Sequence, residues 1–188
     1  MMRAFVTFVL FAACLPAETP SEIARQLDEI GRVATVMVDG DAAKRIVTKR
    51  ALESFRKVDP KDPWVASDNF DVNHEPYIQV KKTLIRLSKL ASFPCDVNLW
   101  SPVEGMPGRI QIVIRNVHEM SQFWSWGVLH QDTPPRLKAV LETGKRVTVT
   151  DRPDMISVLA PVYDSLGDVV AVAEAVAQEK PNPRENVK

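Results

Sequence analysis

Hydrophobic residues near the start of the chain recur with the period of an α-helix. Between Ile23 and Met37 they are spaced by three or four positions, which places them on one face of a helix. Thr19 or Ser21 can cap this helix, and Pro20 suits its first turn. The pattern therefore predicts a long amphipathic helix that begins near residue 20.

The helical pattern is interrupted at Gly40 and resumes over residues 43–58. Either one long helix bends at Gly40, or two helices meet there. The segment 59–63 holds two prolines and two aspartates, so it breaks any helix. A third helix is expected to begin near Asn73 and to continue to about Ala91, because apolar residues again recur on one face.

From Pro94 onward the period changes to the alternation of β-strands. We expect five strands, over residues 97–101, 110–115, 146–151, 155–163 and 168–177. Gly/Pro-rich and Asp/Gly-containing segments at 104–108 and 164–167 predict the turns of two hairpins. A helix is expected between the second and third strands, with Thr133 as its N-cap and Gly144 just past its end. The fold class is therefore α+β, an antiparallel sheet with helices on one face or end.

The alternation also predicts which side chains share a face of the sheet. In the first strand, Val97 and Leu99 should face one way, and Asn98 and Trp100 the other. In the second strand, we expect Ile110, Ile112 and Ile114 together on one face. The segment from Val117 to Trp126 has no clear period and is expected to be helical or loop-like.

The first 17 residues have the pattern of a secretory signal peptide. A basic residue precedes an almost wholly apolar run from Ala4 to Leu15, which is too short for a comfortable membrane span. Soluble export, periplasmic or secreted, is the favoured interpretation. The alternative is a lipid anchor, because the residues before Cys14 resemble a bacterial lipobox with Phe11 in place of the usual leucine. Nothing later in the chain approaches transmembrane length.

Composition narrows the class of protein further. The 188 residues suit one domain, and the 24 basic residues balance the 24 acidic ones, so nucleic-acid binding is a poor hypothesis. Cys14 lies in the apolar leader, which leaves Cys95 alone in the mature domain. A disulfide framework is thereby excluded, and we expect Cys95 to be a small core residue at the start of a strand.

The C-terminal part of the sequence resembles the single Cache domain, a PAS-like extracytoplasmic sensor module. The helix Arg136–Lys145 that ends near a glycine, and the sequence Ser157–Asp164 followed by Leu166–Val170, are similar to the last helix and terminal hairpin of that family. With the helices ahead of the first two strands, the resemblance covers residues 20–178, and one domain is expected over 18–178. It leaves 1–17 as signal peptide and 179–188 as a flexible charged tail.

The resemblance implies a five-stranded antiparallel sheet with a long N-terminal helix behind it and a small-ligand pocket on the other face. Such domains bind organic acids or amino acids and normally continue into a transmembrane helix. Here the chain ends in a charged tail, so any signal is expected to pass through a partner, and a membrane-bound signalling protein is the candidate. The proposed mechanism is closure of the segment 123–132 over the sheet, which shifts a partner-binding surface on the N-terminal helix.

Several residues are candidates for the ligand pocket. The segment 123–127 is rich in aromatic residues and precedes a histidine, a composition typical of small-molecule sites, although the same tryptophans also suit a core. An arginine at a strand end can pair with a ligand carboxylate or remain a solvated surface charge. The predicted ligand-binding residues are Trp100, Arg115, Trp124, Trp126, His130 and Tyr163.

Catalytic, metal and cofactor motifs are not recognisable. His74, His118 and His130 lack zinc-motif spacing, the run 68–75 lacks the glycine and closing acid of a calcium loop, and no nucleophile elbow or nucleotide-binding loop occurs. We therefore expect no enzyme, no metal and no cofactor. The sequence favours an exported metabolite-binding module. The alternative is a structural or interaction module whose pocket is filled by its own side chains.

Overall fold

The computed structural model describes residues 19–57, 71–123 and 132–179. These ranges contain five helices and five strands: α1 (Pro20–Met37), α2 (Gly40–Lys44), α3 (Lys49–Phe55), α4 (His74–Ser88), β1 (Asp96–Pro102), β2 (Ile110–Ile114), α5 (Pro135–Thr143), β3 (Val147–Val149), β4 (Met155–Tyr163) and β5 (Val169–Gln178). The expected signal peptide, with Cys14, and nearly all of the expected tail lie outside the described residues.

The long N-terminal helix is confirmed as α1. Thr19 caps it, since its hydroxyl accepts a hydrogen bond from the Glu22 amide, and Pro20 lies in the first turn. The helix ends at Met37, and Asp39 caps α2 at once, so two helices meet near Gly40 rather than one helix bending. The second helical run is itself divided, because Val47 forms an isolated bridge with Val72 between α2 and α3.

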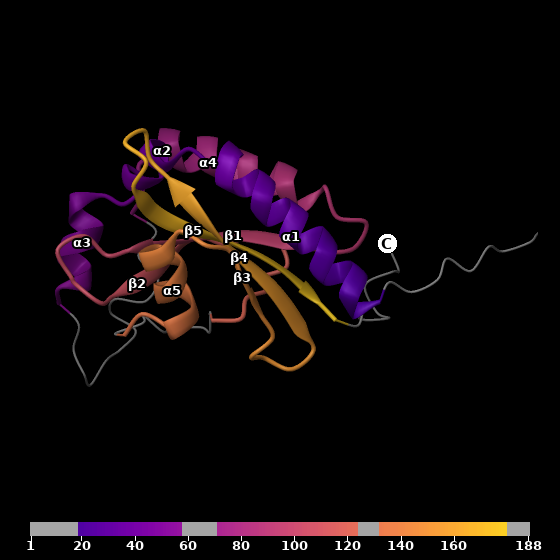
Figure 1. The fold of residues 1–188 in the computed structure, drawn as a ribbon. Helices are drawn as coiled ribbons and strands as arrows, with labels where there is room; N and C mark the ends of the chain where they lie inside the picture. Colours follow the sequence, from indigo (N-terminus) through magenta and orange to yellow (C-terminus); the bar gives the residue numbers. More distant parts are fainter. Residues whose placement is uncertain (1–18, 58–70, 124–131, 180–188) are drawn as a thin grey trace, which may run out of the picture.

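All five strands form one antiparallel sheet in the order β2-β1-β5-β4-β3 (Figure 1). The β4–β5 hairpin forms the centre, with Leu159 opposite Glu174, and β1 lies on the other side of β5. The α+β class and the antiparallel pairing expected from the alternating pattern are thus confirmed. The expected strand at 146–151 is shorter than predicted and covers Val147–Val149.

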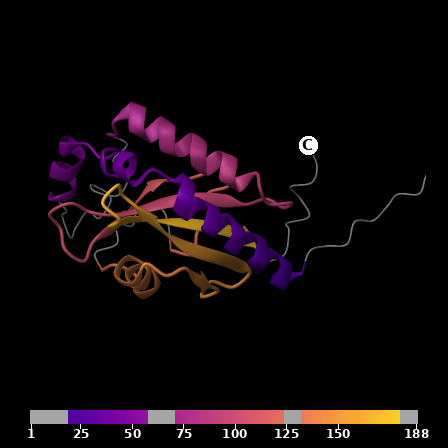
Figure 2. The same cartoon turned by 45° about the horizontal axis from the view of Figure 1, so that its top comes forward.

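Helices cover both faces of the sheet. Figure 2 shows α1 and α4 on one side and α5 on the other. The larger core lies under α1, α2 and α4, and it includes Leu27, Leu84 and the alanines of β5. A smaller core under α5 contains Trp100, Leu137 and Leu159. The sheet is therefore buried on both faces along β4 and β5, which explains why these strands are so apolar.

Two local predictions are wrong. The sequence predicts that Ile114 shares a face with Ile110, but the pairing shifts between Leu99 and Trp100, where Ile112 and Ile114 are opposite successive residues. Because this bulge adds one residue to β2, Ile114 packs in the larger core and Ile110 in the smaller one.

Thr133 is also not the cap of α5. Pro134 takes that position, and both the amide and the hydroxyl of Thr133 donate to the Gly108 carbonyl.

The turn of the β4–β5 hairpin packs closely against α2. Lys44 binds Asp164 at 2.7 Å, and the Ser165 amide donates to Asp41. A side chain on Gly40 would meet the backbone of Tyr163, so only glycine allows this approach. The contact fixes the end of α1 relative to the central hairpin.

Candidate functional site

The face of the sheet away from α1 carries a row of buried polar side chains. Asp96, Asn98 and Trp100 alternate along β1, and Glu174 lies opposite Asn98 on β5. All four are at most 1% exposed. The prediction that Asn98 and Trp100 share a face is confirmed, because successive residues of a strand point to opposite sides. A polar site is thereby built into the middle of the domain.

Glu174 is the centre of this row. Its Oε2 accepts hydrogen bonds from the indole N–H of Trp100 at 2.8 Å, from the Ser121 hydroxyl at 2.7 Å and from the Asn98 amide at 3.4 Å. Its Oε1 accepts from the backbone amide of Gln122 at 2.7 Å and from the Ser157 hydroxyl at 3.1 Å. These five donors are all uncharged. Burial therefore raises the pKa of Glu174, although the hydrogen bonds oppose the shift.

Asp96 and Asn98 hold the chain that follows β2. The backbone amides of His118 and Met120 donate to Asp96, and the His118 ring nitrogen Nδ1 lies 2.8 Å from the same carboxylate. Asn98 accepts from the Asn116 amide and donates to the Met120 carbonyl at 2.7 Å. Because these side chains bind the backbone of the segment 116–120, they fix its path over the sheet.

Gln122 extends the network to the β3–β4 connection. Its amide nitrogen donates to the Met155 carbonyl at 2.9 Å, and its oxygen accepts from the backbone of Arg152. The Arg152 guanidinium in turn donates to the Ser121 carbonyl. Phe123 packs edge-on against Trp100 with ring centroids 6.0 Å apart. Residues 121–123 are thus attached to the sheet by hydrogen bonds and an aromatic contact.

The expected ligand residues that fall within the described ranges do not form one site. Trp100 is fully buried and bound to Glu174, and the Tyr163 hydroxyl donates to the Gly144 carbonyl at 3.1 Å. Arg115 lies just after β2, with 15% of its side chain exposed, and is 3.9 Å from Glu119. Trp124, Trp126 and His130 lie outside the described residues.

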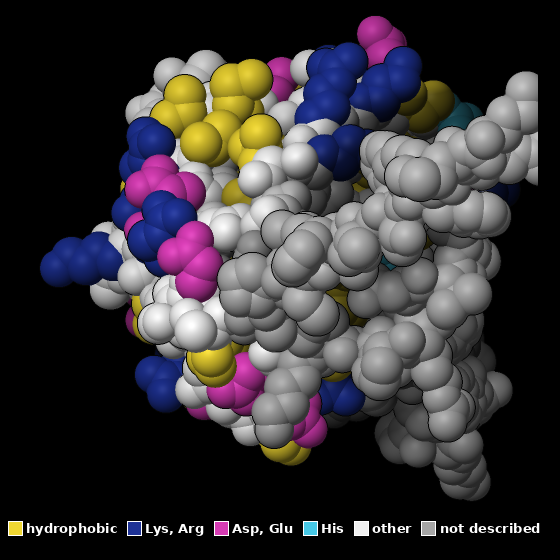
Figure 3. Space-filling view, turned by 90° about the vertical axis from the view of Figure 1, so that its right-hand side faces the viewer, with side chains coloured by type: hydrophobic (Ala, Val, Ile, Leu, Met, Phe, Trp, Pro, Cys, Tyr) yellow, Lys and Arg dark blue, Asp and Glu magenta, His cyan; other side chains and the backbone are white. Residues whose placement is uncertain are grey.

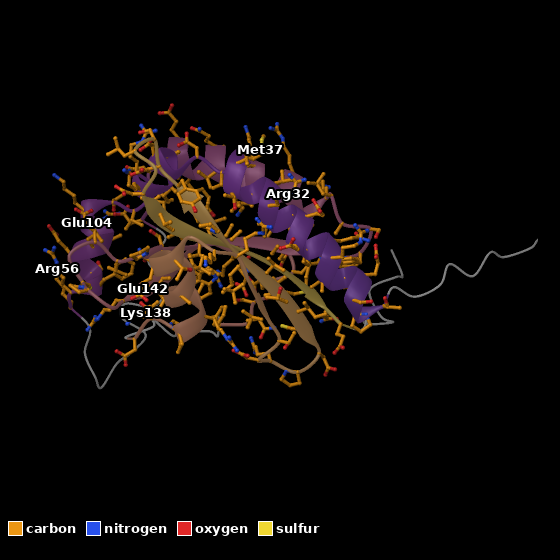
Figure 4. All side chains as sticks on the ribbon, viewed as in Figure 1. Arg32, Met37, Arg56, Glu104, Lys138 and Glu142 are labelled. Carbon is orange, nitrogen blue, oxygen red and sulfur yellow. The ribbon has the colours of Figure 1, made fainter. Side chains whose placement is uncertain are left out.

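A surface groove lies elsewhere, between the β1–β2 turn and α5. Its volume is about 510 Å³. The groove is lined by Pro102, Val103, Gly105, Met106, Pro107, Gly108, Arg109, Asp132, Thr133, Lys138, Leu141 and Glu142. Figure 4 shows Lys138 and Glu142 on α5 at the same end of the molecule as Glu104 of the turn. The two hydrogen bonds from Thr133 to Gly108 join the two walls.

Sequence reasoning missed this groove. Lys138, Leu141 and Glu142 have the spacing of one helix face, and Gly105 and Gly108 adopt the left-handed conformation that shapes the turn. Both signals are visible in the sequence. The sequence does not show that the turn and the helix lie side by side, because this depends on tertiary contacts between segments about 30 residues apart.

Three further features of the described part of the chain concern metal binding, the thiol and membrane helices. No group of three or more His, Cys, Asp or Glu side chains there has the arrangement of a metal site. Cys95 is buried, and burial raises the pKa of its thiol to about 12. Among the described helices, none combines the length and the apolar character needed to cross a membrane.

Exposed apolar residues also occur outside the groove. They are Val36, Met37, Ile78, Leu90, Val117 and Leu166. Figure 3 views the end of the molecule opposite the groove and shows one group of apolar side chains beside several lysines and arginines. This surface contains no hydrogen-bonded cluster comparable to that around Glu174 among the described residues.

Comparison with known proteins adds no family. The chain matches no protein-family model, and a search of curated proteins finds no relative. The site is therefore interpreted from its own geometry.

Proposed function

We propose that the chain is an exported PAS-like binding domain, similar to single Cache domains, that recognises a small metabolite and acts through a partner. The five-stranded antiparallel sheet and the long helix behind it support this proposal, because they agree with the layout that the sequence resemblance implies. A membrane-bound signalling protein is the proposed partner. No reaction of its own is assigned to the domain.

The groove between α5 and the β1–β2 turn is the observation that carries the binding function. Its volume of about 510 Å³ lies within the range of about 300–1,000 Å³ that is usual for small-molecule sites. Its lining combines apolar side chains, such as Met106 and Leu141, with a few charged groups. Apolar walls bind the body of a ligand, and sparse charges orient it.

A thermal-shift screen of the purified protein tests the binding function. We would measure the melting temperature with organic acids, amino acids, sugars and amines, each at about 10 mM. A ligand present at 100 times its dissociation constant should stabilise the protein by about 2.7 kcal/mol. Hits would be confirmed by isothermal titration calorimetry. If no compound class shifts the melting temperature, the metabolite-binding proposal is wrong.

The second candidate is an interaction module that binds no metabolite. The packing around Glu174 favours it, because Trp100 and the five-donor network fill the sheet face where the resemblance implies a ligand pocket. A negative ligand screen, together with recovery of a specific membrane protein after cross-linking in the native cell envelope, would support this candidate.

Export is proposed from the leader sequence. A full-length fusion to alkaline phosphatase, which is active only outside the cytoplasm, tests it directly. The control is a variant with Leu10→Arg in the apolar run, which should abolish phosphatase activity. Equal activity of the two fusions would refute export through this leader, and metabolic labelling with palmitate would reveal lipidation of Cys14.

A further inference from the structure

Arg109 is a half-buried cation in the wall of the groove. It lies directly before β2, where its backbone closes the β1–β2 turn through hydrogen bonds with Val103 and Met106. Its guanidinium donates to the sulfur of Met106 at 3.9 Å, and it forms no ion pair with any described residue. A thioether is a weak acceptor, so most of the hydrogen-bonding capacity of this guanidinium is unused by the fold.

The other basic residues near the middle of the domain differ from Arg109. Arg115 is within ion-pair distance of Glu119, and Arg152 donates to the Ser121 carbonyl. Lys138, across the groove, is paired with Glu142 at 3.7 Å. Among the described residues, Arg109 is therefore the groove cation without an ion pair.

Apolar side chains line part of the groove. Met106 and Leu141 are both partly buried, and each packs at the edge of a different hydrophobic cluster. If an aliphatic chain of a ligand lay between Met106 and Leu141, apolar surface of the ligand and of both side chains would be buried from water. Such burial contributes about 0.8 kcal/mol for each methylene group, which is about a fourfold gain in affinity.

The acids of the groove limit how much negative charge a ligand can carry. Asp132 and Glu142 also line it, and both side chains are exposed. A second carboxylate on the ligand would lie near these groups and be repelled, whereas a single carboxylate can be held by the fork of Arg109.

From these contacts we infer that the groove binds a small monocarboxylate with an aliphatic body, its carboxylate on Arg109 and its chain between Met106 and Leu141. This inference rests on the proposed metabolite-binding function and specifies its site and ligand class. It differs from the expectation that Arg115, Trp100 and Tyr163 form the pocket.

Calorimetric titration with 4-methylpentanoate is the direct test. Glutarate has a second carboxylate, which the acids of the groove should repel. We expect 4-methylpentanoate to bind more tightly than glutarate. In the series acetate, butanoate and hexanoate, affinity should rise by up to about fourfold per methylene. Tighter binding of glutarate, or affinity independent of chain length, would overturn the assigned ligand class.

Variants locate the site. Arg109→Gln should weaken 4-methylpentanoate binding by about tenfold or more, and Arg109→Lys should recover part of the loss, because lysine keeps the charge but not the paired donors. Arg136→Gln is the matched control, since Arg136 lies on α5 outside the groove lining and pairs with Asp151. Its affinity should equal that of the unchanged protein.

The outcomes separate the two proposals. If the screen finds ligands but Arg109→Gln binds them as well as the unchanged protein does, the groove assignment is wrong and the metabolite-binding function stands. If no ligand of any class binds the unchanged protein, both are wrong. Circular dichroism of each variant shows that a loss of binding does not come from a loss of fold.

Discussion

Replacing Glu174 with glutamine tests whether the polar network holds a carboxyl group specifically. Each carboxyl oxygen faces an N–H group that can only donate: the Gln122 amide at Oε1 and the Trp100 indole at Oε2. The amide of glutamine has one oxygen and one NH₂ group. Whichever way it is oriented, its NH₂ group points at one of these two N–H groups.

The cost of this mismatch follows from burial. One donor loses its acceptor in a site that is fully buried, and an unsatisfied buried donor costs about 1–3 kcal/mol. The hydroxyls of Ser121 and Ser157 do not add to the cost, because they rotate and accept from the new NH₂ group. We therefore expect Glu174→Gln to lower the free energy of unfolding by about 1–3 kcal/mol. The control Glu29→Gln, at an exposed position on α1, should change it by less than about 0.5 kcal/mol.

The effect should also depend on pH. Burial raises the pKa of Glu174 in the folded protein above its ordinary value of 4.5. The protonated form is therefore favoured in the folded state, so its contribution to stability is complete below pH 4.5 and is lost as the pH rises through the raised pKa. Glutamine does not titrate. The deficit of Glu174→Gln should accordingly be largest near pH 4 and smaller at pH 8.

Urea unfolding monitored by circular dichroism at pH 4, 6 and 8 measures these differences. The same substitution in a Trp100→Phe background is a second test. Trp100→Phe removes the indole donor, so the NH₂ group of glutamine can lie on that side without facing another donor. In this background Glu174→Gln should cost at least about 1 kcal/mol less than in the unchanged protein. Equal stability of Glu174→Gln and the unchanged protein at all three pH values would refute the proposed hydrogen-bond constraint.

Three further predictions test the packing of the fold. Gly40→Ala should destabilise the protein by about 1–3 kcal/mol in urea unfolding, because its methyl group meets the backbone of Tyr163; an unchanged midpoint would contradict this contact. Leu27→Ala, in the core under α1, should cost about 2–5 kcal/mol, whereas Val36→Ala on the exposed side should stay within about 0.5 kcal/mol. Cys95 should react with iodoacetamide at pH 8 only after unfolding, since burial raises its pKa to about 12; rapid labelling of the native protein would show that the thiol is accessible.

Alternation along the chain was sufficient to predict the sheet and the faces of β1. Period-two patterns depend on local geometry, so Asn98 and Trp100 could be placed together without knowing their neighbours. The bulge near Ile112 could not be predicted, because it depends on how β2 pairs with β1. Because the bulge shifts the register, Ile114 packs in the larger core and not, as predicted, on the same face as Ile110.

The centre of the polar network also has a signal in the sequence. Glu174 is a single acid within the apolar strand β5, and an ionisable group in such a run must find several donors when it is buried. The donors themselves come from β1, β4 and the segment after β2, at separations of 17 to 76 residues. Only the tertiary structure shows that they converge.

The contrast between Glu174 and Arg109 is the reason for proposing the groove, rather than the sheet face, as the binding site. Glu174 is fully buried, and the chain itself supplies five donors to its two oxygens. Arg109 is half-buried, and its hydrogen-bond partner among the described residues, beyond its own backbone contacts, is a sulfur atom. Since a guanidinium gains most from a paired carboxylate, an anion that enters the groove adds an interaction that folding left unmade. We therefore expect ligand binding where hydrogen-bond donors are left unpaired by the fold, as at Arg109, and a rigid structure where the fold pairs them, as around Glu174.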